Sequence, residues 1–522
     1  MSGLQLTYAS IFVCFLIALF FFRRGASKKD VKEIKEVIQA EIKKLHKQIE
    51  HSSKVVVYLD GLPERADVKE QVLLRDALRA MANYKWDEAI TIFEKALADA
   101  SKKDKAVFYF QIAFCQESKG TYEIALGEYR KALLIFDELQ DKEGISACFG
   151  NLGNVYWKFG NLSKALNYHQ KSIELNELTG NKKGIASSTG NVGLVYQTLG
   201  EYKKALEHYQ KSLIIFNKIG DKEGEANALG NMGRVYYTLG DLPKAVECSR
   251  KALALHKEIN EKGGEASDLC NMGRVYDSLG ELPKALAHYQ NSLVLYKEIG
   301  NKEGEASILG NMGLVYMTLD DLPKALVLQQ EALALDKEIG NKEGIARDLC
   351  NISLVYKSLG ELPKALEHLQ KALVLNDEIG NKKGKANTLF NTGLIYQTLG
   401  ELPRALELYC KALSLHKDIG NKAGIANVHG NRGIIYQAMG DLPNALVLHQ
   451  KALKLHKEID NMKGVAKDLC NIGVVYQAMG NRTKALENHK SALEICERYN
   501  FHGIIKIAKA GINACQSIGD NN

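Results

Sequence analysis

The sequence predicts an all-α solenoid of stacked helix pairs, preceded by one N-terminal transmembrane helix. Three observations support this fold class. The chain repeats itself every 40 residues from residue 141 onward, a period typical of helical-repeat proteins. Glycine and proline recur at fixed places and divide each repeat into two helical segments. Residues 1–22 carry no charged side chain, and basic residues follow them directly.

The 40-residue period sets the expected domain organisation. A typical unit, residues 301–340, reads NKEGEASILGNMGLVYMTLDDLPKALVLQQEALALDKEIG. Divergent units that share the same turn precede the regular ones, and a lone closing helix is expected at about 503–518. The expected segments are a transmembrane anchor at 1–24, a juxtamembrane amphipathic helix and linker at 25–66, divergent units at 67–140, nine regular units at 141–500, and a capping helix and tail at 501–522.

Each unit is predicted to form two helices. In the unit that starts at residue 221, the first helix is expected from about Gly224 to Leu239, and Gly240 supplies the left-handed residue that ends many helices. Asp241 can cap the second helix, and Pro243 falls in its first turn, where a missing N–H does no harm. Proline recurs at this place as Pro243, Pro283, Pro323, Pro363, Pro403 and Pro443.

Two further positions are interpreted as packing residues. Tyrosine fills position 16 of every regular unit, as Tyr156, Tyr196, Tyr236, Tyr276, Tyr316, Tyr356, Tyr396, Tyr436 and Tyr476. Position 13 is Gly153, Gly193, Gly233, Gly273, Gly313, Ser353, Gly393, Gly433 or Gly473. Because glycine and serine are small, they let neighbouring helices approach closely. A single helix pair cannot bury its apolar face, so stacking supplies the core.

The repeat resembles that of the tetratricopeptide repeat family. Leu229, Gly233 and Tyr236 on the first helix of one unit, with Ala245 and Ala252 on the second, match the signature of that family. The 40-residue length and the phrase GN-x-G-x-x-Y are similar to the repeats of Pins-type polarity scaffolds, and kinesin light chains carry a similar asparagine. The resemblance covers about residues 70–518. It implies a right-handed superhelical solenoid of about eleven helix pairs plus a capping helix, with one face of the first helices lining a concave groove.

Position 11 is asparagine in every regular unit and is the candidate binding position. The residues are Asn151, Asn191, Asn231, Asn271, Asn311, Asn351, Asn391, Asn431 and Asn471. Asparagine is a mediocre helix former, and its amide has donors and an acceptor that match a peptide backbone. In related arrays such asparagines hold an extended peptide, and the resemblance carries that role to these nine positions. The alternative is structural, in which the asparagines persist from recent duplication or bond a neighbouring helix end.

Four basic residues are expected on the same face of the first helices. They are Arg234 and Arg274 at position 14, and Arg347 and Lys467 at position 7. A basic groove favours an acidic protein or peptide ligand. The alternative is that these side chains are only solvated charges on a helix surface.

The N-terminus is interpreted as a membrane anchor. Leu4 to Phe22 would rise about 28 Å as a helix, close to the thickness of a bilayer core. Residues 1–54 hold ten Lys and Arg against five Asp and Glu, which is +5 of the net charge of +7. Because the basic residues follow the apolar run, the positive-inside rule predicts a single-pass protein with its repeat array in the cytoplasm. A cleaved signal peptide and an apolar helix packed on the solenoid are the alternatives.

The segment after the anchor is predicted to be an amphipathic helix. Residues 28–52 carry apolar side chains at an average spacing of 3.6 residues. Such a helix could pair with a second copy to form a homo-oligomer, lie on the membrane, or cover the first helices of the solenoid. A β-prone run at 55–59 is interpreted as an extended linker.

The remaining patterns argue against catalysis and against nucleic-acid binding. Outside residues 1–54 the charge is nearly balanced, so there is no basic stripe for nucleic acid. No phosphate-binding loop, HExxH, GxSxG or EF-hand pattern occurs, so neither enzyme activity, a metal nor a cofactor is expected. His449 and His456 share one helix face, and the sequence suggests no acidic partner for them.

The predicted function is that of a membrane-anchored scaffold that binds extended peptide segments in an asparagine-lined groove. Two alternatives stay open. The array could be a structural component of a membrane-associated assembly, or a regulatory or sensor subunit of a separately encoded enzyme.

Overall fold

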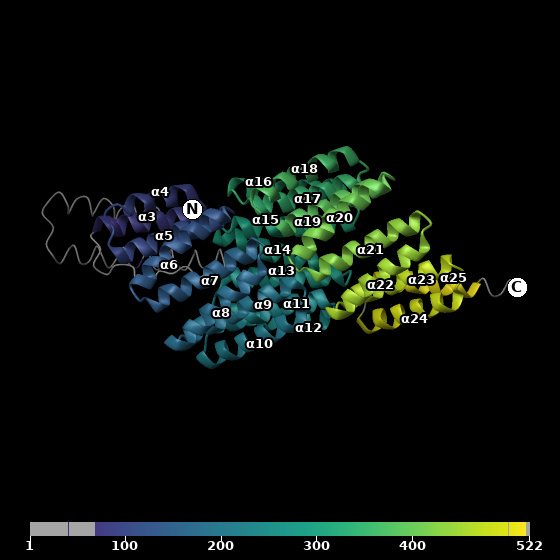
Figure 1. The fold of residues 1–522 in the computed structure, drawn as a ribbon, viewed down its shortest axis with the longest axis horizontal. Helices are drawn as coiled ribbons and strands as arrows, with labels where there is room; N and C mark the ends of the chain where they lie inside the picture. Colours follow the sequence, from purple (N-terminus) through teal and green to yellow (C-terminus); the bar gives the residue numbers. More distant parts are fainter. Residues whose placement is uncertain (1–39, 41–67, 500, 518–522) are drawn as a thin grey trace. The chain divides into compact units, whose positions relative to one another are not determined.

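A computed structural model describes Ala40, residues 68–499 and residues 501–517, and every regular element in this part of the chain is an α-helix (Figure 1). The predicted anchor at 1–24 and nearly all of the predicted helix at 28–52 lie outside these residues. None of the helices described is long and apolar enough to cross a membrane. By their contacts the residues form two compact units.

The first unit comprises residues up to Ser118 together with Glu123–Gly144. Its helices are α3 (Val68–Ala82), α4 (Trp86–Ala96), α5 (Lys102–Ser118) and α6 (Tyr122–Glu138). The core is aromatic, and the ring of Trp86 meets that of Phe114 edge-on at 6.2 Å, beside the buried Phe93 and Phe108. The divergent units therefore have a core of bulky side chains.

The second unit comprises Lys119–Tyr122 and Ile145–Asn522. Its helices are α7 (Lys142–Lys158), α8 (Leu162–Thr179), α9 (Lys182–Leu199), α10 (Tyr202–Ile219), α11 (Lys222–Leu239), α12 (Leu242–Glu258), α13 (Lys262–Ser278), α14 (Leu282–Ile299), α15 (Lys302–Thr318), α16 (Leu322–Glu338), α17 (Lys342–Ser358), α18 (Leu362–Glu378), α19 (Lys382–Thr398), α20 (Leu402–Asp418), α21 (Lys422–Ala438), α22 (Leu442–Glu458), α23 (Met462–Ala478), α24 (Arg482–Tyr499) and α25 (His502–Ser517). The prediction of paired helices with a last single helix is confirmed.

The helix boundaries follow the predicted local signals. Gly240 has φ +84°, which lets it end α11 without the strain that a Cβ would cause. The Asp241 carboxylate accepts from the N–H of Lys244, so it caps α12 as predicted. The six repeated prolines lie at the first or second position of α12, α14, α16, α18, α20 and α22.

The packing role of the position-13 glycines is confirmed. A Cβ at Gly273 would lie 2.6 Å from the Tyr289 ring, and one at Gly433 would lie 2.7 Å from the His449 ring. Both rings come from the second helix of the same unit and are almost fully buried. The missing side chain therefore makes room for a large one across the pair. The position-16 tyrosines also pack on the second helix, where Tyr276 stacks on His288 at 5.1 Å.

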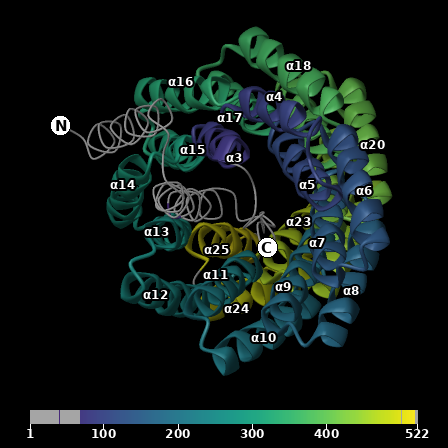
Figure 2. The same ribbon diagram turned by 90° about the vertical axis from the view of Figure 1, so that its left-hand side faces the viewer.

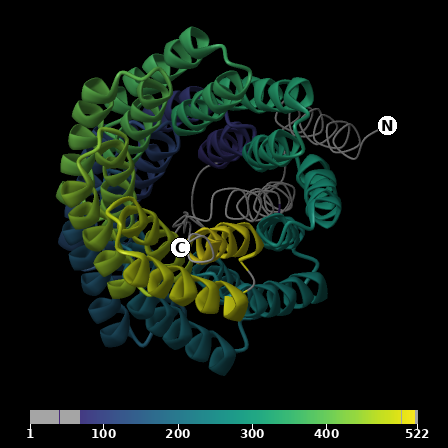
Figure 3. The ribbon, with the colours of Figure 1, turned by 90° about the vertical axis from the view of Figure 1, so that its right-hand side faces the viewer.

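The second unit winds so that elements about 260 residues apart touch. A Cβ at Gly160 would lie 3.5 Å from Ile419 Cγ2, and one at Gly200 would lie 3.8 Å from Ile459 Cγ2. Ile459 is 3% exposed and belongs to the same apolar cluster as Tyr202. Within this unit, Figures 2 and 3 show the second helices, such as α10 and α18, outside the first helices. Successive turns of the second unit are therefore in apolar contact.

Candidate functional site

The predicted asparagine row lies on helices that adjoin one another. Each asparagine sits near the middle of a first helix, and first helices of successive units touch, as α9 does α11 and α15 does α17. If Gly310 carried a Cβ atom, that atom would lie 3.8 Å from Nδ2 of Asn351, which belongs to the next unit. Asn151 is buried, and the other eight asparagines are half-buried. The first helices that carry the row contact one another from α9 to α19 and again at α21 and α23, and all of its side chains except Asn151 are only partly covered.

Four of the nine asparagines use their side chains inside the protein. Asn151 and Asn431 donate to backbone carbonyls one turn earlier, at 3.2 and 3.0 Å. Asn231 accepts from Arg234 at 3.3 Å, and Asn311 donates to the sulfur of Cys270 on the preceding first helix at 3.5 Å. The remaining five make no side-chain hydrogen bond to any residue that the structure describes: Asn191, Asn271, Asn351, Asn391 and Asn471.

Beside the row, side chains link first helices of neighbouring units. Tyr237 accepts a hydrogen bond from Ser278 at 2.9 Å, and the Trp157 indole donates to Thr198 at 2.7 Å. Both pairs join position 17 of one unit to position 18 of the next. The sequence analysis missed these links because only two units have a residue at position 17 that pairs in this way.

The structure brings Arg234 and Arg274 together. They line one small recess with Tyr237, and the Arg274 guanidinium lies 4.8 Å from the centre of the Tyr237 ring. Burial lowers the pKa of Arg234, and the nearby Arg274 lowers it further. Within the described residues neither arginine forms an ion pair with a carboxylate. These two predicted site residues are therefore a pair of unneutralised charges.

Lys467 lines a larger cavity, which the sequence analysis did not foresee. This cavity of about 250 Å³ is also lined by Lys463, Tyr237, Ser278 and Asn427. Burial lowers the pKa of Lys467, and its neighbour Lys463 lowers it further. Neither lysine has a salt bridge to a carboxylate in the part of the chain that is described. Tyr237 borders both spaces, so the cavity with the two lysines adjoins the recess with the two arginines.

Arg347 lies elsewhere and is engaged within the protein. Its guanidinium donates to Asp336 at 2.9 Å and to Asp348 at 3.2 Å, and both carboxylates are fully buried. Asp336 lies in the last turn of α16 and Asp348 lies in α17, so Arg347 neutralises a joint between two units. Arg347 therefore does not lie with the other three predicted basic residues. A ligand would have to compete with Asp336 and Asp348 for its side chain.

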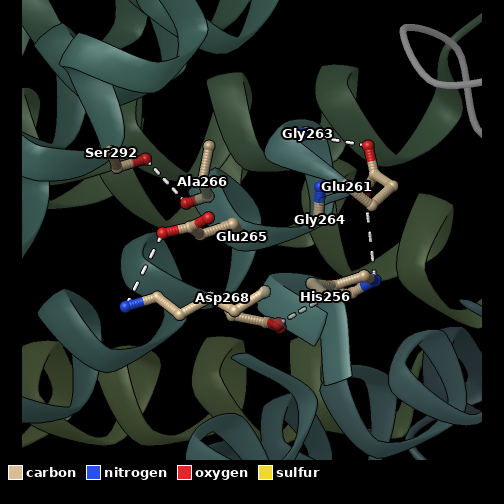
Figure 4. Close-up of polar contacts among 9 residues, drawn as sticks. His256, Glu261, Gly263, Gly264, Glu265, Ala266, Asp268 and Ser292 are labelled. Atoms are coloured by element: carbon tan, nitrogen blue, oxygen red, sulfur yellow. Dashed lines mark hydrogen bonds and ion pairs between the residues drawn. The ribbon is translucent and has the colours of Figure 1, made fainter. Parts of the chain in front are cut away.

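Two other joints between units contain a histidine and a carboxylate. His456 Nδ1 donates to Asp468 at 2.7 Å, which is the acidic partner that the sequence did not suggest. The same pair occurs as His256 and Asp268, also at 2.7 Å, between α12 and α13 (Figure 4). Twelve residues separate the members of each pair, so only the helix turn between them brings them together.

The groups that the site offers are hydrogen-bonding amides and positive charges. Within residues 68–499 and 501–517, no group of three histidine, cysteine or carboxylate side chains could hold a metal ion. The site has amide donors and acceptors along the first helices, two lysines at the cavity and two arginines at the adjoining recess. Such groups can hydrogen-bond a peptide backbone and pair with acidic side chains.

Stacked helix pairs with a row of polar side chains on adjoining helices define a helical-repeat protein. The sequence model of the tetratricopeptide repeat matches residues 104–177, 184–258, 265–338, 304–375, 344–418 and 424–498. The chain therefore belongs to the tetratricopeptide repeat family, as its sequence predicted. No curated protein matches it.

Several solved structures share the repeat architecture at low identity. A crystal structure of BtubC (BKLC) from P. vanneervenii is 22% identical, with 43% of this chain and 91% of that one covered, at TM-score 0.35. The crystal structure of yeast Tom70 is 15% identical, with 87% of this chain and 97% of that one covered, at TM-score 0.45. The crystal structure of a Rap protein complexed with Competence and Sporulation Factor is 13% identical, with 75% of this chain and 98% of that one covered, at TM-score 0.46. The family assignment rests on the sequence match alone.

Proposed function

We propose that this protein is a membrane-anchored interaction scaffold whose repeat array holds extended segments of partner proteins. The observation that carries the proposal is the asparagine row on adjoining first helices. Five of its nine side chains make no hydrogen bond within the described residues, although each is half-buried. Half-buried amides without protein partners are suited to bonding a ligand backbone.

The spacing of the row suits a long ligand. Packed helices lie about 8–10 Å apart, so the asparagines recur roughly every 10–20 Å along the array. An extended peptide rises ~3.3 Å per residue and would meet one asparagine about every three to six residues. Each net hydrogen bond stabilises a complex by only about 1 kcal/mol, so affinity grows with the number of units engaged.

The cations in the recess and the cavity beside Tyr237 would make the site prefer acidic ligands. Arg234, Arg274, Lys463 and Lys467 have no carboxylate in salt-bridge contact within the described part of the chain. Placing like charges close together is unfavourable even where, as at Lys463 and Lys467, the side chains reach solvent, and an anionic ligand would relieve that repulsion. We therefore expect partner segments that carry Asp or Glu where they pass Tyr237.

The membrane part of the proposal rests on the sequence. Residues 1–24 would be the single-pass anchor, with the array on the cytoplasmic side. Deleting residues 1–24 should move the protein from the membrane pellet to the supernatant. If the deleted protein still sediments with membranes in high salt, the anchor is elsewhere.

The scaffold proposal is tested by comparing matched asparagine variants. The triple variant Asn271→Ala, Asn351→Ala and Asn391→Ala removes three amides that have no partner in the described protein. The control, Asn291→Ala, removes an exposed amide from the second helix α14. Partners crosslinked and purified from membrane extract should fall in yield with the triple variant and remain with the control. Equal yields for both, with helicity unchanged, would contradict the proposal.

A Lys463→Ala, Lys467→Ala variant separates the acidic preference from the scaffold itself. If only the partners rich in Asp and Glu are lost, the cavity selects for charge. If every partner is retained while the asparagine variant loses them, the row binds and the cavity does not.

A further inference from the structure

The contact between successive turns of the second unit follows a rule within the repeat. Positions 19 and 20, at the end of the first helix, meet positions 40 and 39 respectively, at the end of the second helix about six and a half units later. Gly160 faces Ile419 in this way, and Gly200 faces Ile459. A Cβ at Gly420 would likewise lie 2.9 Å from Leu199 Cδ2. One edge of each turn therefore fits the opposite edge of the next.

The edge made by position 19 is covered in one turn and bare in the next. Phe159, Leu199 and Leu239 are partly buried, as the following turn lies against them. Leu279 is half-buried as well, whereas the residues at this position from unit 301 onward, which we call the leading rim, are 40–53% exposed: Leu319, Leu359, Leu399, Met439 and Met479. The same apolar side chains thus lose their cover where the described chain has no further turn.

The opposite edge shows the reverse pattern. At position 39, Ile379, Ile419 and Ile459 are 3–4% exposed because an earlier turn covers them. Ile219 and Ile299, which together with the half-buried Ile259 between them we call the trailing rim, are 37% and 38% exposed. The second unit therefore has two bare apolar rims, and the edges to which they belong are in contact inside the same unit.

Charges beside the rims are also complementary. Position 21, next to the leading rim, is Asp321, Glu361, Glu401 or Asp441. Position 2, next to the trailing rim, is Lys222 or Lys302, which form exposed ion pairs with Glu258 and Glu338. Where two turns meet, a Cβ at Gly200 would lie 3.7 Å from the Cβ of Lys422, and Glu201 follows Gly200 directly. The internal contact thus places a lysine of one edge beside the acidic position of the other.

We propose that the leading rim of one molecule docks on the trailing rim of a second copy. The occupant is a second copy because the contact between turns already joins these two edges, with the same residue types and the same charge order. Exposed apolar side chains in a row mark such surfaces. As the two rims are different surfaces, the contact is head-to-tail, and association continues beyond the dimer unless a ring closes. The proposal does not depend on the asparagine row.

The test is sedimentation velocity of the full chain in detergent micelles over about a hundredfold range of concentration. The average mass of the native protein should rise with concentration. A Leu399→Lys, Met439→Lys variant should associate at least about tenfold more weakly. Its control, Val327→Lys, Val447→Lys, places the same charges on apolar residues that are 52% and 45% exposed on second helices, and should behave as native.

A charge exchange guards against misfolded variants. A Leu399→Glu, Met439→Glu protein and an Ile219→Lys, Ile299→Lys protein should each associate weakly alone and should recover association when mixed. A native protein that stays monomeric overturns the proposal, as does equal association of native and rim variants, which would place the contact in residues 28–52. If a monomer binds liposomes through the leading rim, the rim faces lipid and the proposal is also overturned.

Discussion

The joint between α16 and α17 and the joint between α22 and α23 occupy the same positions of the repeat but differ in chemistry. Asp336 meets Asp348 at the first joint, with Arg347 bonded to both. His456 meets Asp468 at the second, and the histidine donates to the carboxylate. At both joints these groups are almost completely buried, with only Arg347 reaching solvent.

The difference teaches that polar groups of different charge can occupy this joint when each has a hydrogen-bonding partner, whereas apolar pairs such as Phe216 and Ala228 fill it in other units. A histidine and a carboxylate satisfy each other with one hydrogen bond. Two carboxylates need both a bound proton and an outside cation, because buried like charges repel. The α16/α17 joint should therefore be the more sensitive of the two to pH and to substitution.

The effect of pH at the α16/α17 joint has a definite sign. Burial raises the pKa of Asp336 to about 7, against the pull of Arg347. A carboxyl in an unfolded chain titrates near about 3.9. Between about pH 4 and 7 the folded state therefore keeps a proton that the unfolded state has lost, and the free energy of unfolding falls as pH rises. Above about pH 7 Asp336 is ionised in both states, and the free energy of unfolding no longer falls on its account.

The largest effect is expected when Arg347 is replaced. Arg347→Ala leaves two buried carboxyls without their cation, and removing one partner of such a group costs about 2–4 kcal/mol at pH 8. The loss should be smaller at pH 5, where Asp336 holds its proton. Urea unfolding followed by circular dichroism measures both values. Lys342→Ala, which breaks an exposed ion pair with Glu378 on the same helix pair, is the control and should leave the midpoint unchanged.

A smaller and opposite effect is expected for Asp336→Asn. The amide keeps a hydrogen-bonding group at the joint and removes one buried charge, so the variant should be about 1–2 kcal/mol more stable than native at pH 8. It should also lose most of the fall in stability between about pH 4 and 7. Urea midpoints across that range measure this, and an undiminished pH dependence would mean that another group is responsible.

The smallest effect is expected at the α22/α23 joint. Asp468→Asn replaces a charge-assisted hydrogen bond to His456 by a neutral one, which should cost about 1 kcal/mol. Thermal unfolding of this variant beside Asp336→Asn makes the comparison direct. The two joints differ as described only if one substitution destabilises and the other stabilises at pH 8.

The regular parts of the fold were predictable because each has a local cause. Pro243 and Gly240 act on their own backbone, so the helix ends followed from the repeat alone. The glycine at position 13 also signalled a close helix crossing, and Tyr289 over Gly273 confirms it. The asparagine row was predictable as a pattern, whereas which asparagines bond internally was not, because Arg234 and Cys270 lie on other turns or helices.

The basic residues show where sequence reasoning stopped. Position within the repeat grouped Arg347 with Lys467, yet Arg347 pairs with Asp336 across a joint and Lys467 lines a cavity with Lys463. Position 36 varies from unit to unit, so its partner at position 8 could not be inferred from the period.

By itself the sequence determined the helical-repeat solenoid, its helix boundaries and the family, because these depend on local backbone preferences repeated many times. Only the tertiary structure decided which edges meet and which charges are neutralised. Contact between Gly200 and Ile459 depends on the angle between successive units, and small angles summed over six units set which residues meet. The exposed rims and the grouping of cations beside Tyr237 both result from these accumulated angles between units.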